Sequence, residues 1–257
     1  MIKVSIITPS FNQGQFIEQT ILSVLNQSYK NVEYIVVDGG STDNTLTILD
    51  KYKDKIDIII SEKDKGQSDA INKGFRLATG TLVGWINSDD ILYPDCVANL
   101  VKAYESNPDG AIYYCPNLHF IDKDRNIILT KRLDITNKEH LLRINYDVNQ
   151  QASFYSNELL KRVDYLNEDI QYCMDLDLWL RLLDHAEIIP ICQEPQAGFR
   201  LWEETKTSTA TLQFLGEIRK VLQQNGVRSQ EKIIWRIRVQ SFRFRVKQIL
   251  LKLLRKK

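Results

Sequence analysis

The sequence lacks the residues on which several classes of protein depend. Only four of its 257 residues are cysteine, and no two of them form a Cys-x-x-Cys pair. A disulfide framework and a structural zinc site are therefore both disfavoured, and free thiols fit a reducing compartment. No apolar run approaches the roughly 20 residues that a membrane-spanning helix needs.

Signals for export and for glycine-cradled phosphates are also missing. The first residues, MIKVSIITPSF, carry one charge and then have the pattern of a strand rather than of a signal peptide. We therefore expect a cytoplasmic protein, either free or peripheral on the cytoplasmic face of a membrane. The chain has no Gly-x-Gly-x-x-Gly after its first apolar run and no Gly-x-x-x-x-Gly-Lys-Ser/Thr, which disfavours a dinucleotide fold and a P-loop.

The net charge is small overall, but the charged residues are unevenly divided. The formal net charge is +1. Residues 228–257 hold eleven Lys or Arg and a single acid, Glu231, for a net of +10, which leaves −9 for residues 1–227. An acidic body with a basic end predicts that the basic end contacts an anionic surface.

What the sequence does contain is an alternation of apolar runs and segments of helical periodicity. Strands are expected at 4–11 (broken by Pro9), 32–40, 56–62 and 81–90, and helices at 16–27, 41–52, 66–79 and from Pro94 to Ser106. Ser41 or Thr42 is expected to cap the second helix, and Gly80 to end the third. This order predicts an α/β fold with a mostly parallel sheet and helices on both faces.

Polar and acidic residues follow the expected strands. The first strand ends in Thr8-Pro9-Ser10, the second in Asp38, the third in Glu62 and Asp64, and the fourth in Asp89-Asp90. Ligands of such sheets bind beyond the carboxyl ends of the strands. Two adjacent carboxylates repel each other, and a divalent cation that bridges them to phosphate oxygens would relieve that repulsion.

Four motifs in this order and spacing resemble family 2 glycosyltransferases with the GT-A fold, of the inverting, bacterial surface-glycan type: IITPSFNQ, VVDGGSTDNT, GQSDAINKG and NSDD. The resemblance runs from about residue 3 to about residue 207. It implies that Thr8, Pro9 and Asp38 contact the nucleoside. It further implies that Asp89 faces the ribose and that Asp90 ligates Mn²⁺ or Mg²⁺ at the diphosphate.

The resemblance extends to three less regular positions. Asp69 either faces the base or donor sugar or is an acid that favours the N-terminus of its helix. Arg200 and Lys206 are positioned to clamp the diphosphate. Trp202 stands where the family often has a histidine near the metal, which is a departure from the family pattern.

The second half is expected to bind the acceptor and supply the base. A strand and then a helix are expected over 147–163, and a helix over 172–186. Asp175 and Asp177 stand at the start of that helix, where acids are also common as favourable partners of the helix dipole. By resemblance of MDLDLWLR to the family, Asp175 is the general base, and Met174 replaces a glutamate. Gln150 and Gln151 resemble an acceptor-side segment.

The basic end has a helical pattern. From residue 230 it contains no Gly or Pro, and apolar residues recur at steps of four and three: Trp235, Val239, Phe242, Val246, Ile249 and Leu253. This composition is typical of a helix that lies on an anionic membrane. Packing on the domain and binding of a partner remain alternatives, and nucleic acid is disfavoured because no reading motif occurs. The chain is divided accordingly into a domain, 1–227, and a tail, 228–257. Within the domain, 1–110 binds the nucleotide sugar and 111–227 the acceptor.

These features together predict a metal-dependent inverting glycosyltransferase. It would move a sugar from a nucleotide-diphosphate sugar, UDP-linked, to a hydroxyl of a glycan or lipid-linked acceptor in surface polysaccharide synthesis. One alternative is a sugar-nucleotide-binding protein without activity. Another is a sugar nucleotidyltransferase, which would need a Gly-rich loop with Lys or Arg near residue 10, and TPSFNQGQ has neither basic residue.

Overall fold

A computed structural model of the chain describes residues 1–202 and 211–254, with side chains as far as Val246. Its larger sheet has seven strands in the order β10-β6-β9-β4-β1-β2-β3. Their bounds are β1 Val4–Ser10, β2 Val32–Asp38, β3 Ile58–Ser61, β4 Leu82–Trp85, β6 Ile112–Tyr114, β9 Ser153–Ser156 and β10 Ile188–Pro190. Strands β3, β2, β1 and β4 run parallel, and β9 is antiparallel to both of its neighbours.

A smaller sheet of four strands, in the order β5-β11-β7-β8, is not expected from the sequence pattern. It consists of β5 Ile91–Leu92, β7 Asn117–Ile121, β8 Ile127–Arg132 and β11 Ala197–Arg200. Strand β5 begins directly after Asp90 and pairs with β11, whose last residue is Arg200. The small sheet therefore fixes the position of the turn that carries the two adjacent aspartates.

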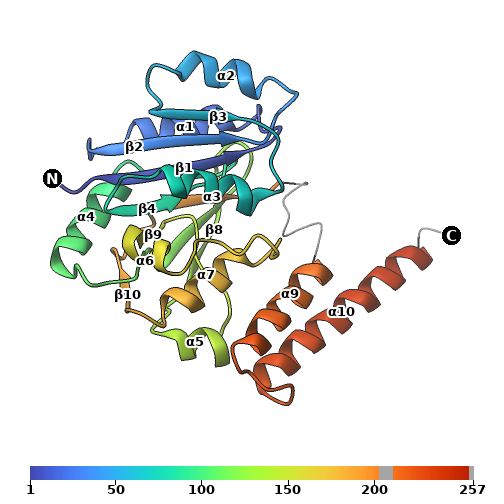
Figure 1. Ribbon diagram of the computed structural model, residues 1–257. Coiled ribbons are helices and arrows are strands. Elements are labelled where there is room, and N and C mark those ends of the chain that lie inside the picture. The colour runs from blue at the N-terminus through green and yellow to red at the C-terminus, as the bar shows by residue number, and fades with distance from the viewer. Residues whose placement is uncertain (203–210, 255–257) are drawn as a thin grey trace.

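Helices cover both faces of the larger sheet. They are α1 Ile17–Leu25, α2 Thr45–Tyr52, α3 Gln67–Leu77, α4 Cys96–Ser106, α5 Lys138–Arg143, α6 Asn157–Arg162, α7 Met174–Leu182, α9 Thr211–Gln224 and α10 Lys232–Leu254. Successive strand residues enter opposite cores: Ile7 packs with α3 and α7, whereas Ile6 packs with α1 and α4. The expected α/β class with a mostly parallel sheet is confirmed (Figure 1).

Three local expectations are wrong. Pro9 does not break β1, because β1 pairs with β4 only as far as Ile7 and a missing N–H at Pro9 leaves no ladder bond unmade. The second helix is preceded by Asn44 rather than capped by Ser41, whose hydroxyl binds Asp38 instead. Gly80 does not end α3; it lies against β1, where a Cβ would approach the Ser5 amide nitrogen to 2.6 Å.

The basic end forms α10, which lies beside α9 and projects with it from the lower right of Figure 1. The first turns of α10 belong to the protein core, because Ile233, Ile234 and Ile237 are buried in the same cluster as α7. Part of the basic segment thus packs on the domain, which is one of the alternatives that the sequence left open. Among the described helices, none has the length and apolar character to cross a membrane.

Candidate active site

A cavity of about 660 Å³ lies beyond the carboxyl ends of β1 and β4. Side chains from many parts of the chain face it, among them the end of β1, the turn after β4, residues 146–151, the start of α7, and α9. Pro9, Asp64, Asp89, Gln150, Gln151, Asp175 and Trp202 are among its lining residues. The strand-end residues therefore meet at one site, as the parallel sheet requires.

The two adjacent aspartates are placed differently. Asp89 lines the cavity, whereas Asp90 is fully buried beneath it. The Arg200 backbone N–H donates to Asp90 Oδ1 at 2.8 Å, and the Thr20 hydroxyl donates to the Asp90 carbonyl oxygen at 2.7 Å. Burial, and next the charge of Asp89, raise the pKa of Asp90 well above its ordinary value.

The indole of Trp202 holds the side chain of Asp89. Trp202 Nε1 donates to Asp89 Oδ2 at 2.9 Å, and the Trp202 ring meets Phe16 edge-on. Burial raises the pKa of Asp89, while the indole N–H and the Arg200 guanidinium oppose that rise. Trp202 thus orients the carboxylate that faces the cavity.

Arg200 does not face the cavity. Its guanidinium donates to the carbonyl oxygens of Asp89, at 2.6 Å, and of Lys123, at 2.6 Å, and to Gln19 Oε1, at 2.9 Å. It also lies over the ring of Phe16. Because the side chain is fully buried among these partners, the structure does not support its predicted contact with a diphosphate and assigns it to holding the Asp89 turn. Lys206, the other predicted clamp, lies outside the described residues.

The residues predicted to contact the nucleoside are also divided between the cavity wall and the buried layer beneath it. Pro9 lines the cavity, but Thr8 is buried and its hydroxyl accepts from Tyr34. Asp38 is fully buried, and its carboxylate accepts from Ser41 and from Ser61. Neither Thr8 nor Asp38 lies on the cavity wall, so the structure places both beneath the site; their contact with a nucleoside stays a prediction.

Asp69 has the second of its two predicted roles in this structure. Its Oδ2 accepts from the Lys65 N–H at 3.0 Å and lies 3.4 Å from the Lys73 ammonium. Burial raises the pKa of Asp69, but these two partners outweigh it and the net shift is downward. Asp69 is not on the cavity wall and stabilises the first turn of α3.

The start of α7 brings a carboxylate to the far wall of the cavity. Asp175 is half-buried there, and its Oδ1 accepts from the Leu176 N–H at 2.8 Å. Burial raises the pKa of Asp175 to about 6, opposed by nearby N–H groups and assisted by the charges of Asp147 and Glu217. Asp177 is instead engaged by Arg181 one turn on, at 2.8 Å. Asp175 is therefore the acid of this helix that can exchange a proton with a ligand.

Sequence reasoning missed the residue that fixes α7. Glu217 of α9 accepts from the backbone N–H groups of Gln171, Tyr172 and Cys173, at 2.6 to 3.0 Å. These are donors just before and at the start of α7, which a helix cannot satisfy internally. No local signal connects residue 217 with residue 172, because the contact forms only when α9 folds back on the domain.

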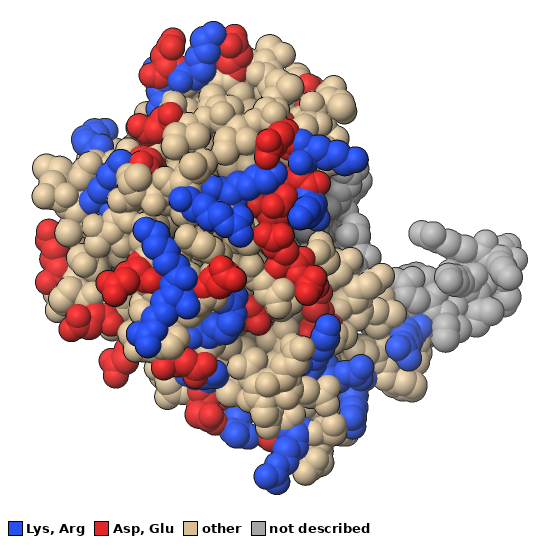
Figure 2. Space-filling view, viewed as in Figure 1, with Lys and Arg blue, Asp and Glu red and all other residues tan. Residues whose placement is uncertain are grey.

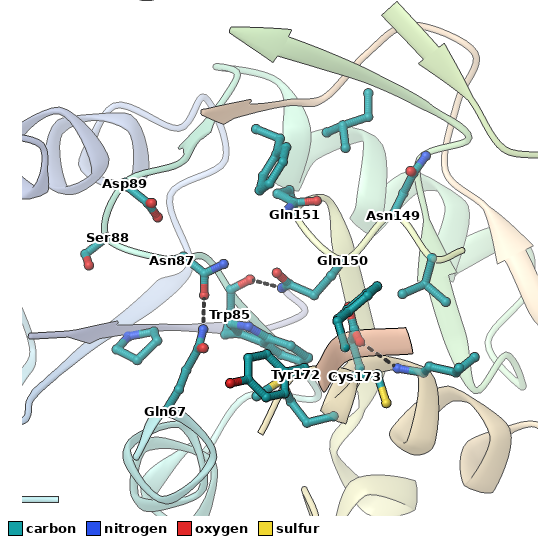
Figure 3. Close-up of a pocket in the computed structure, with 18 of the residues that line it drawn as sticks. Gln67, Trp85, Asn87, Ser88, Asp89, Asn149, Gln150, Gln151, Tyr172 and Cys173 are labelled. Atoms are coloured by element: carbon teal, nitrogen blue, oxygen red, sulfur yellow. Dashed lines mark hydrogen bonds between the residues drawn. The ribbon is translucent and has the colours of Figure 1, made fainter. Parts of the chain in front are cut away.

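Polar side chains complete the walls, among them Gln150 and Gln151, which resemble an acceptor-side segment of the family. Gln67 donates to Asn87 Oδ1 at 2.8 Å, and Gln150 donates to the Trp85 carbonyl oxygen at 2.7 Å (Figure 3). Lys131 of β8 pairs with Asp147 at 2.7 Å, and both line the cavity. Gln151 reaches toward Asp90 Oδ2 at 3.4 Å. These amides present a neutral hydrogen-bonding surface between the two acidic walls.

The residues present fit a cation only if the ligand supplies most of its oxygens. No cluster of three His, Cys, Asp or Glu side chains occurs in the described part of the chain. Asp89 remains as one carboxylate on the cavity wall, and Mg²⁺ is commonly held by one or two carboxylates together with substrate phosphates. Asp90, which we expected to be the ligand, is buried under the wall, so Asp89 is the better placed of the two.

The sheet order and the strand-end cavity define the class, a domain with the GT-A fold. Residues 5–164 match Glycosyl transferase family 2, and the chain belongs to this family. It is 31% identical over 192 residues to an uncharacterized glycosyltransferase of Rickettsia typhi, which covers 70% of this chain. The chain spans only 58% of the length of that relative.

Solved structures with the same fold include two sugar-nucleotide complexes. One is Staphylococcus aureus TarS 1–349 with UDP-GlcNAc, with a TM-score of 0.71, 19% identity, and coverage of 94% of this chain and 72% of TarS 1–349. The other is a mannosyltransferase of Pyrobaculum calidifontis with GDP-Man and Mn²⁺, with a TM-score of 0.65, 18% identity, and coverage of 94% and 69%. At these identities the likeness establishes the fold.

Proposed function

We propose that this protein transfers a sugar from a UDP-linked donor to a hydroxyl of a glycan or lipid-linked acceptor, with inversion at the anomeric carbon. One observation carries the proposal. A single cavity has Asp89 on the wall formed by the strand ends and Asp175, with a pKa of about 6, on the wall formed by α7. The UDP-GlcNAc complex of TarS supports the donor class.

The chain's own residues account for the proposed steps. The diphosphate of the donor lies at the Asp89 turn, which Arg200 and Trp202 hold rigid. Asp175, ionised above about pH 6, accepts the proton of the acceptor hydroxyl as that oxygen attacks the anomeric carbon. The bond to the nucleoside diphosphate breaks on the opposite face, so one displacement inverts the configuration. The amides of Gln150, Gln151 and Gln67 orient the sugar hydroxyls between the walls.

A divalent cation, Mn²⁺ or Mg²⁺, belongs to this proposal. Asp89 would hold it, and when bound it would neutralise charge on the departing diphosphate. The Mn²⁺ in the mannosyltransferase complex supports this part. Asp89 would meet the cation at the wall, because Asp90 is buried beneath it and its backbone-bonded Oδ1 is engaged by the Arg200 N–H.

The acceptor is proposed to enter from the side of α9 and α10. A second hollow, of about 490 Å³, adjoins the cavity and shares Tyr146, Asp147 and Phe214 with it. Its other lining includes Leu215 and Phe244, which are apolar, and Arg243, which is cationic. This combination of an apolar wall and a cation suits an acceptor that is a lipid phosphate or a glycan linked to one.

The test is a screen of UDP- and GDP-sugars for binding and for slow hydrolysis, with and without Mn²⁺ or Mg²⁺. The proposal predicts that one UDP-sugar is bound and hydrolysed in a cation-dependent reaction, and that Asp175→Asn abolishes hydrolysis but retains binding. Binding without hydrolysis in the unaltered protein would instead identify a sugar-nucleotide-binding protein. Release of pyrophosphate from a nucleoside triphosphate and a sugar phosphate would identify a nucleotidyltransferase.

A further inference from the structure

Helix α10 has two apolar faces, on opposite sides of its axis. Ile233, Ile234 and Ile237 are buried against the domain. Trp235 and Phe242, by contrast, are 61% and 68% exposed, and Val246 is 38% exposed. At about 100° per residue, Trp235, Phe242 and Val246 fall within roughly 40° of one another and point away from the buried isoleucines. We call these three residues, together with the half-buried Val239, the outer stripe.

Basic side chains border the outer stripe on both sides. Lys232 and Arg243 lie about 60° to 80° from Trp235 in one direction, and Arg238 and Arg245 lie about 60° to 80° from it in the other. All four are exposed. Figure 2 shows Lys and Arg side chains gathered around the lower right of the molecule, where α9 and α10 lie. An apolar stripe between two basic rows is the pattern of a helix that lies in a lipid headgroup layer.

The domain cannot cover the outer stripe, because its opposite face already holds α10 in place through the buried isoleucines. A second copy of the chain is a poor occupant. Two stripes placed face to face would bring Arg238 and Arg245 of one copy against the basic rows of the other, and like charges at close range oppose association. The two rows are complementary to an anionic surface, and they can extend around the stripe to reach lipid phosphates.

We propose that the outer stripe of α10 docks on an anionic lipid bilayer, with the aromatic side chains in the headgroup region and the two basic rows on lipid phosphates. This attachment does not depend on the proposed activity. The attachment fixes the orientation of the domain on the membrane, because α10 is joined to the cavity wall. Gln240 on α10 accepts from the hydroxyl of Tyr146, which lines the cavity. The hollow that Arg243 and Phe244 line is then brought close to the lipid surface.

The experiment is sedimentation of the full chain with vesicles of phosphatidylcholine alone or with one third phosphatidylglycerol, at low and at high salt. We expect binding to the anionic vesicles that weakens as salt rises. Trp235→Ser with Phe242→Ser should lower the affinity at least about tenfold even at low salt, because it removes apolar burial that salt does not screen. Arg238→Gln with Arg245→Gln should lower it about 30-fold at low salt.

Matched controls separate the stripe from general surface effects. Ile127→Ser with Ile128→Ser removes two residues of β8 that are 57% and 52% exposed, and should leave vesicle binding unchanged. Lys161→Gln with Arg162→Gln removes the same charge from α6 with the same expected result. The melting temperature of each variant reports folding. Unchanged binding in the Trp235/Phe242 variant, equal binding to neutral vesicles, or a dimer in place of vesicle binding would overturn the proposal.

Discussion

The site contains two acidic pairs, and they use their members in the same way. Of Asp89 and Asp90, the first lines the cavity and the second accepts from the Arg200 backbone. Of Asp175 and Asp177, the first lines the cavity and the second pairs with Arg181. In each pair one carboxylate is available to a ligand because the other anchors its turn or helix. A sequence shows two acids but does not show which one is free.

The pairs differ in what holds the available carboxylate. Burial raises the pKa of Asp89, but the indole N–H of Trp202 and the nearby Arg200 guanidinium oppose that rise by favouring the ionised form. Asp175 has no such cationic partner among the contacts described above, and burial raises its pKa to about 6. The partners of Asp89 suit a carboxylate that faces a cation, whereas Asp175, with a pKa of about 6, suits a group that gains and loses a proton near neutral pH.

The sharpest test of this difference is Asp175→Asn. Transfer or hydrolysis should fall by about 10²–10⁴-fold, the usual size of a general-base contribution, while donor affinity stays within a few-fold. The rate of the unaltered enzyme should rise with pH through about 6, as Asp175 ionises. Steady-state kinetics between pH 5 and 8, together with donor binding by calorimetry, measure both quantities. Retained activity would remove the base role from Asp175.

Stability gives Asp175 a second readout. Its pKa is raised in the folded protein from an ordinary value of 3.8, so ionisation disfavours folding, and stability contributed by the neutral form is lost as pH rises from about 4 to about 6. Asp175→Asn should therefore melt higher than the unaltered protein at pH 7. Asp177→Asn is the matched control: it breaks the pair with Arg181 and should melt lower while keeping its catalytic pH profile.

The other pair is tested by comparing Asp89→Asn with Asp90→Asn. Asp89→Asn removes the charge on the cavity wall and should lower turnover by about 10²-fold and weaken cation-dependent donor binding. Asp90→Asn should change turnover far less, because Asp90 is buried beneath the wall and an asparagine oxygen can still accept from the Arg200 N–H. If Asp90→Asn instead abolishes turnover, the original assignment of the cation to Asp90 is restored.

A smaller effect is expected from Trp202→Phe, which keeps the ring but removes the N–H that donates to Asp89. A hydrogen bond to a charged group contributes about 1.5–3 kcal/mol, and Asp89 is only half-buried, so we expect a loss of about tenfold in donor affinity. The pKa of Asp89 should rise. Titration of donor affinity against pH, with Phe199→Leu as a second altered aromatic of the cavity wall, distinguishes this loss from general damage.

The sequence was a good guide where the signal is local. The order of strands and helices, Asp89-Asp90 after β4 and Asp175 at the start of α7 all follow from periodicity and motif spacing. Where contacts are distant, the pattern fails. Arg200 was expected by resemblance to the family to bind the diphosphate, but it donates to the carbonyl oxygens of residues 89 and 123. In the small sheet, β5 has only two residues, too few to show alternation, and β8 is exposed along almost its whole length, so it has no buried face to show one.

The basic end illustrates the same limit. Its spacing identified the stripe of Trp235, Phe242 and Val246 but gave no way to choose between a lipid surface and the domain. The structure shows that packing on the domain uses a different face, that of Ile233, Ile234 and Ile237. Apolar residues on opposite sides of one helix cancel when hydrophobicity is averaged around its axis. Only the folded structure shows that they form two separate stripes.

The smallest expected effect belongs to Glu217, which connects the second acidic pair with α9. Glu217→Ala leaves the N–H groups of Gln171, Tyr172 and Cys173 without their carboxylate, a loss comparable to removing a helix cap, about 1 to 2 kcal/mol of the free energy of unfolding. The melting temperature should fall by a few degrees. Because Glu217 also contributes negative charge that raises the pKa of Asp175, the acid limb of the pH–rate profile should move to lower pH. Glu158→Ala is the matched control, since it removes an exposed acid from the first turn of α6 and should leave that limb in place. A lower melting temperature with an unmoved limb would show that Glu217 holds α7 without influencing the base.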